Sequence, residues 1–148
     1  TFRVVRTLLD RVDDPKTGRC VDKLQMEVPE WKLAEAKDVA ASQGEKLYNK
    51  FELLENVEYM NQDNLVEMYL DNVWRSNLTI TGAGGLPDYQ KAGNVVRPQT
   101  TVRCSLRVAP NANAEQMKDN LIEILTSDVP YDAKVTVLNS FAGNGFCQ

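Results

Sequence analysis

The chain of 148 residues contains no histidine. Imidazole is the side chain that proteins use most often for proton transfer near neutral pH and for metal binding. Its absence excludes a Ser–His or Cys–His nucleophile within this chain. The chain also has few cysteines, Cys20, Cys104 and Cys147, and their spacing matches no metal-binding motif. We expect three reduced thiols and a cytoplasmic location.

Three further features are missing, and each argues against a class of partner. No apolar run approaches the ~20 residues of a membrane span, so we expect no membrane partner. Arg3 and Arg6 interrupt the only apolar stretch at the start, and nothing there resembles a signal peptide. The net charge of −4 lacks the basic footprint of nucleic-acid binding, so we expect no nucleic-acid partner.

What is present is the composition of a folded domain. Hydrophobic residues make up 43% and charged residues 26% of the chain. A chain of this length fits one domain, residues 1–148, and can bury roughly 70% of its unfolded surface. Apolar residues spaced three and four apart predict a helix from Phe2 to Val12. No Ser, Asp or Asn cap and no leading turn precede Phe2, so we expect the domain to be a piece of a larger protein.

Residues 20–72 indicate an irregular helical insert. Pro29 suits the first turn of a helix that Gly44 ends. A second short helix is predicted over Glu45–Leu54, and a third begins near Asp63, a plausible cap. The acidic residues scattered through this insert are interpreted as a solvated face, because spacing alone cannot show that two carboxylates converge in a cleft.

Alternation of polar and apolar residues predicts strands after the insert. A strand around Leu78 and Ile80 is broken by the glycine-rich turn Gly82–Pro87. Residues 101–108 alternate without interruption, which predicts a strand with one buried face. The inward set is Val102, Cys104, Leu106 and Val108, and the outward set is Thr101, Arg103, Ser105 and Arg107.

The remaining elements complete a recognisable order. Asn111 or Asn113 caps an amphipathic helix with Met117, Leu121, Ile124 and Leu125 inward, and Ala133–Leu138 reads as a last strand. Adding one strand before Phe2 gives βαββαβ. We therefore predict an α+β, ferredoxin-like antiparallel sheet with two helices on one face, the helical insert at 20–72, and its first strand missing.

Two polar residues, Asn94 and Arg107, stand out as candidates for ligand binding. Taken alone, Arg107 fits a solvated strand arginine and Asn94 fits a turn residue after Gly93. The glycine-rich run at Gly82–Gly85 lacks the spacing of a phosphate-binding loop and is followed by Pro87, which favours a plain turn. Residue patterns alone thus predict an α+β domain and assign no function to its polar face.

Several segments, in order, resemble the lid (dimerisation) domain of the zinc metallopeptidases that include carnosine dipeptidase, aminoacylase, acetylornithine deacetylase and glutamate carboxypeptidase. They are Leu8–Asp14 with Thr17–Gly18, Thr79–Pro87, Ala92–Pro98 and Ser105–Arg107. The resemblance covers nearly the whole chain and is closest to the carnosine-dipeptidase-like branch, whose lid carries a helical insert.

The resemblance implies a lid excised from a two-domain hydrolase. Zinc, its ligands and the general base would belong to the missing catalytic domain, so no cofactor and no catalytic residue are expected in this chain, which alone should be inactive. Asn94 and Arg107 match the family's residues that bind the substrate's carboxylate or backbone, commonly in the partner subunit's active site. The implied partners are a second lid in a homodimer and a small peptide or N-acyl amino acid.

A different reading is also open. The chain could be a free-standing ferredoxin-like module that binds an amino acid or a protein partner with no enzyme attached. The gene on either side of this segment separates the two hypotheses, because a lid requires a metal-binding domain around it.

Overall fold

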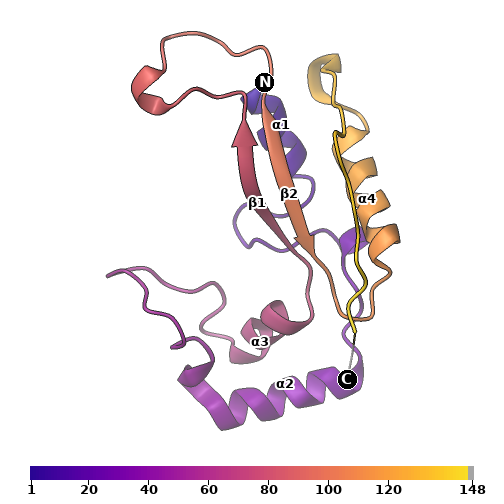
Figure 1. Ribbon diagram of the computed structural model, residues 1–148. Helices are drawn as coiled ribbons and strands as arrows, with labels where there is room; N and C mark the ends of the chain where they lie inside the picture. Colours follow the sequence, from indigo (N-terminus) through magenta and orange to yellow (C-terminus); the bar gives the residue numbers. More distant parts are fainter. Residues whose placement is uncertain (147–148) are drawn as a thin grey trace.

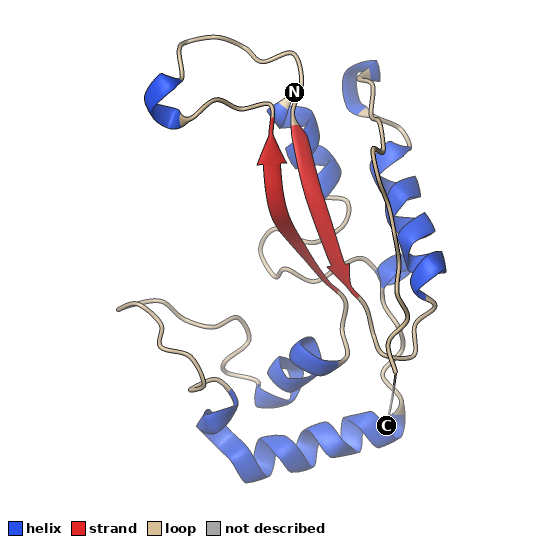
Figure 2. Cartoon of the chain, in the orientation of Figure 1, coloured by secondary structure: helices blue, strands red, loops and turns tan. Residues whose placement is uncertain are grey.

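The computed structural model describes residues 1–146. Helices and strands follow one another in the order three helices, a β-hairpin and a last helix (Figures 1 and 2). The elements are α1 Phe2–Leu9, α2 Glu30–Gln43, α3 Leu65–Val73, β1 Asn77–Gly84, β2 Thr101–Arg107 and α4 Ala114–Thr126. Single 3₁₀ turns lie at Asp22–Leu24, Gly44–Leu47, Tyr89–Lys91 and Pro130–Asp132. The α+β class predicted from sequence is confirmed.

The hairpin has the register that the sequence alternation predicts. β1 and β2 pair antiparallel, with Leu78 opposite Leu106 and Asn77 opposite Arg107. A bulge at Thr81 shifts the register between Ile80 and Gly82. Along β2, the residues predicted to face inward are half-buried and those between them are exposed, because successive side chains of a strand point to opposite faces.

Capping side chains define where the helices begin and end. Asn113 Oδ1 accepts a hydrogen bond from the backbone N–H of Gln116, which selects Asn113 over Asn111 as the cap of α4. The cap of α3 is Asn64, which accepts from Glu67 N–H, and not the neighbouring Asp63. The α2 helix ends at Gly44, as predicted, and this residue has a positive φ of 50°.

Two predicted elements are absent from the described residues. Glu45–Leu54 contains only the 3₁₀ turn Gly44–Leu47, so the predicted second helix is wrong. Residues 133–138 form no strand, although their backbone runs alongside α4 in Figure 1. Within residues 1–146 the sheet therefore has the two strands of the hairpin, and both of its outer edges are open.

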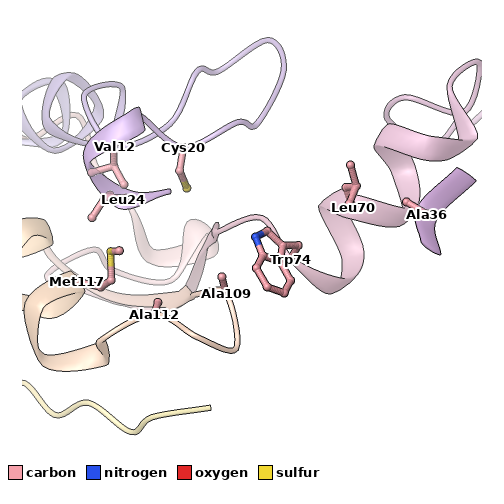
Figure 3. Close-up of a cluster of buried hydrophobic side chains, with 9 residues drawn as sticks. All are labelled: Val12, Cys20, Leu24, Ala36, Leu70, Trp74, Ala109, Ala112 and Met117. Carbon is pink, nitrogen blue, oxygen red and sulfur yellow. The ribbon is translucent and has the colours of Figure 1, made fainter. Parts of the chain in front are cut away.

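Trp74 lies at the centre of the buried core. Its side chain is 2% exposed, and Figure 3 shows it between Leu70 and Ala36 on one side and the group around Met117 on the other. The other core members are Val12, Cys20, Leu24, Ala109 and Ala112. The predicted apolar face of α4 packs against this cluster. The same core thus joins the helical insert, the end of the hairpin and α4.

None of the helices within residues 1–146 combines the length and the apolar character that crossing a membrane requires.

Candidate functional site

The hairpin and the loop that joins its strands carry positive charge in an otherwise acidic chain. Between Ser76 and Ala114 the charged residues are Lys91, Arg97, Arg103 and Arg107 against the single carboxylate of Asp88, whereas the whole chain has a net charge of −4. Arg103 and Arg107 point to the same exposed face of β2. Within residues 1–146 neither side chain has an ion-pair partner. A guanidinium group that has no ion-pair partner can bind a carboxylate through two parallel hydrogen bonds.

Asn94 is exposed in the long loop that joins β1 to β2. The neck of this loop is tight: a Cβ on Gly85 would lie 2.6 Å from Gln99 O, and Gly85 has a φ of +81°. Arg97 Nε also donates a hydrogen bond of 3.3 Å to Gly85 O. The two ends of the loop are therefore held close together at Gly85 and Gln99, and Asn94 lies in the exposed part of the loop between them.

The structure places Asn94 and Arg107 toward opposite ends of β2. Arg107 pairs with Asn77 where the hairpin meets the helices, and Asn94 lies in the loop at the other end (Figure 1). Seven residues of strand span about 20 Å at ~3.3 Å per residue. Within one chain the two predicted substrate-binding residues are not brought together. No interaction in the structure tests their predicted roles.

A half-buried ammonium lies among aromatic rings where α2 meets α3. Lys32 Nζ lies 5.4 Å from the ring centroid of Trp31 and 5.8 Å from those of Tyr69 and Trp74. It also pairs with Glu35 Oε1 at 2.9 Å, and the Lys32 side chain is only 13% exposed. The carboxylate of Glu35 balances the charge of the Lys32 ammonium within the cluster. The cluster therefore joins the two helices and is not a vacant binding site.

Tyr69 completes this cluster. Its hydroxyl donates a hydrogen bond of 2.5 Å to Glu35 Oε1. This bond, with burial and the Glu35 charge, raises the pKa of Tyr69 to about 12. Hydrogen bonds from Lys32 and Tyr69 lower the pKa of Glu35. Sequence spacing signals only the Lys32–Glu35 pair, three residues apart on one helix, because Tyr69 is distant in the chain.

Glu67 and Asp71 of α3 hold two arginines in a second charged cluster. Glu67 Oε2 accepts hydrogen bonds from Arg19 at 2.7 Å and from Arg75 at 2.8 Å. Burial works to raise the pKa of Glu67, but the hydrogen bond from Arg19 and the charge of Arg75 outweigh it, so this pKa is lowered. Both carboxylates are engaged by cations, and the lowered pKa leaves Glu67 unsuited to act as a proton donor near neutral pH. The cluster fastens the loop around Arg19 to α3.

The thiols lack the environment of a reactive cysteine. Burial, with the charge of Asp13, raises the pKa of Cys20 to about 11, and burial also raises the pKa of Cys104. Both are free cysteines, whereas Cys147 lies outside the described residues. No group of three Cys, Asp or Glu side chains within residues 1–146 could hold a metal ion.

No known protein-family model matches this chain, and no curated protein matches it either.

Proposed function

We propose that this chain is the lid and dimerisation domain of a zinc-dependent peptidase or amidohydrolase. The observation that best supports the proposal is Arg107: an exposed guanidinium at the end of a paired strand, without an ion-pair partner among the described residues. Arg19 and Arg75, by contrast, are both paired with Glu67 of α3. Arg107 is instead positioned by the sheet and left free for an anion.

In the proposed role this chain binds and orients the substrate. Arg107 pairs with the carboxylate of a small peptide or N-acyl amino acid, and Asn94 from a second copy of the chain supplies one directed hydrogen bond. Zinc in a separate catalytic domain would supply an activated water for hydrolysis. Movement of the lid over that domain would exclude bulk water and hold the substrate in place.

The finer fold in this proposal is the ferredoxin-like sheet. It requires a strand along the open edge of β2, with residues 133–138 beyond it. Thr1 lies beside the start of β2, because its Oγ1 is 2.6 Å from Thr100 Oγ1. A strand that led into α1 and ended at Thr1 would run antiparallel to β2. It would satisfy backbone groups that are otherwise open at the edge.

The test is kinetic and uses the protein encoded by the complete gene. Dipeptides and N-acyl amino acids are assayed with and without zinc, and Arg107→Ala is compared with the parent protein. We expect the variant to lose well over tenfold in kcat/KM. Arg103→Ala is the matched control, because it removes the same charge from the same face of β2. The control should lose less than threefold.

Two outcomes would overturn the proposal. Unchanged kinetics for Arg107→Ala would remove Arg107 from the site. A gene that encodes no metal-binding domain around this segment would favour a free-standing module that binds an amino acid or a protein.

A further inference from the structure

We propose that Asn77 binds the substrate carboxylate together with Arg107, and that Thr79 orients the Asn77 amide for this contact. The inference rests on the proposed function and adds a second binding residue to the same carboxylate site. Asn77 and Arg107 are directly opposite each other in the antiparallel hairpin, where β1 begins and β2 ends (Figure 1). Opposite residues of such a pair share one face, with Cβ atoms about 4.5–5.5 Å apart. One carboxylate group is therefore within reach of both side chains.

The Asn77 side chain is held by its neighbour on the same face of β1. Thr79 Oγ1 donates a hydrogen bond of 3.1 Å to Asn77 Oδ1. This bond engages the amide oxygen, and within residues 1–146 no acceptor contacts Asn77 Nδ2. The amino group of an amide only donates hydrogen bonds. Asn77 thus offers a free donor beside the Arg107 guanidinium, a combination that suits an anion.

Neither strand of the hairpin contains a carboxylate that would compete for these donors. The charged side chains of β1 and β2 are Arg103 and Arg107 alone. The next cross-strand pair on the same face is Thr79 and Ser105, whose hydroxyls are uncharged. An anion beside Arg107 therefore meets no charge of its own sign from either strand.

Arg103 lies on the same face of β2 but has different surroundings. It stands opposite Gly82, which has no side chain, because the bulge at Thr81 shifts the register. The Thr81 hydroxyl donates to the backbone oxygen of Arg103 at 3.5 Å. The partner strand thus places no side-chain amide opposite Arg103. The register of the hairpin distinguishes the two arginines, which the alternation of the sequence does not.

The buried core fixes the backbone on both sides of the Asn77–Arg107 pair. Ser76, which precedes Asn77, is 4% exposed, and its backbone N–H donates a hydrogen bond of 2.9 Å to Gln25 Oε1. Ala109, which follows shortly after Arg107, is 1% exposed. Binding groups on a paired strand beside buried residues lose little backbone freedom when a ligand arrives.

The experiment uses the protein encoded by the complete gene and the dipeptide or N-acyl amino acid that it hydrolyses with the highest kcat/KM. Asn77→Ala should lower this kcat/KM about tenfold, because it removes a hydrogen bond to a charged group. Asn77→Asp should lower it further, because it places a charge of the ligand's own sign beside the carboxylate.

Thr79 is a positioning residue, and its variants separate positioning from packing. Thr79→Val keeps the shape of the side chain and should lower kcat/KM about threefold, since the amide is no longer held. Thr79→Ser retains the hydroxyl and should restore the activity. In an Asn77→Ala background Thr79→Val should have no further effect, because no amide remains to be oriented. Thr81→Val, which removes a hydroxyl from the same strand beside Arg103, is the matched control and should leave kcat/KM unchanged.

The outcomes separate this inference from the lid proposal. Full activity of Asn77→Ala, or equal losses in Asn77→Ala and Asn77→Asp, would overturn the role of Asn77, whereas a large loss in Arg107→Ala would leave the lid proposal standing. Unchanged kinetics for Arg107→Ala would overturn both. If Asn77→Ala fails to fold, the comparison of Thr79→Val with Thr79→Ser decides the question, because both variants retain Asn77.

Discussion

The enclosed ammonium of Lys32 should contribute measurably to stability. Lys32→Met keeps the aliphatic stem, which packs against the rings, and removes the charge. A cation–π contact contributes about 0.5–2 kcal/mol, depending on how far the cation is removed from water. The partly exposed pair with Glu35, three residues along the helix, contributes about 0.3–0.5 kcal/mol. Because three rings share one ammonium, their contributions do not add, and we expect a loss of about 1–2 kcal/mol.

Urea denaturation at neutral pH measures this loss. The midpoint should fall without a change in the denaturant slope, because the variant exposes no additional surface on unfolding. For a chain of this size the melting temperature should fall by about 2–8 °C. Lys37→Met is the control, since Lys37 is an exposed lysine of the same helix. Equal stability of the two variants would refute the interpretation of Lys32 as a joint between α2 and α3.

The remaining predictions concern titration and thiol reactivity. The pKa of Tyr69 is raised from its ordinary value of 10 to about 12 in the folded chain. The hydrogen bond from Tyr69 to Glu35 therefore stabilises the fold fully below pH 10. This contribution should disappear as the pH rises from 10 to 12. The free energy of unfolding should therefore fall less over that range in Tyr69→Phe than in the parent chain. An identical dependence on pH in the two proteins would contradict the role of this hydrogen bond. Cys20 is 3% exposed and has a pKa of about 11, so in a Cys147→Ser background at pH 8 we expect a thiol reagent to modify it only after denaturant is added. Rapid labelling of Cys20 in the folded chain, located by mass spectrometry, would show that it is not buried.

The hairpin and α4 were predictable because their signals are local. The alternation around Cys104 depends only on the two-residue period of a strand, and the α4 helix carries its own cap at Asn113. Neither signal depends on which distant segment packs against it. The substrate-binding roles of Asn94 and Arg107 are different, because their residue types are compatible with plain surface positions and the structure holds no ligand contact for them.

The two predicted elements that are absent from the described residues were drawn from periodicity, which does not reveal whether a packing partner is present. Residues 133–138 alternate like a strand, but a strand also needs a neighbour to accept its hydrogen bonds. Glu45–Leu54 contains helix-forming residues, yet Leu54 is 83% and Phe51 75% exposed. With no face buried, a segment of that length cannot hold a helix in water. The cluster around Lys32 escaped prediction for the related reason that its members converge only after folding.

The separation of Asn94 from Arg107 constrains how both residues could serve one active site. The strand between them spans about 20 Å, and a dipeptide or N-acyl amino acid is too short to reach from one to the other. If both contact the same small substrate, they must come from two copies of the chain. A homodimer is then a requirement of the proposed site and not only an aid to stability, since each site would be incomplete without the partner's lid.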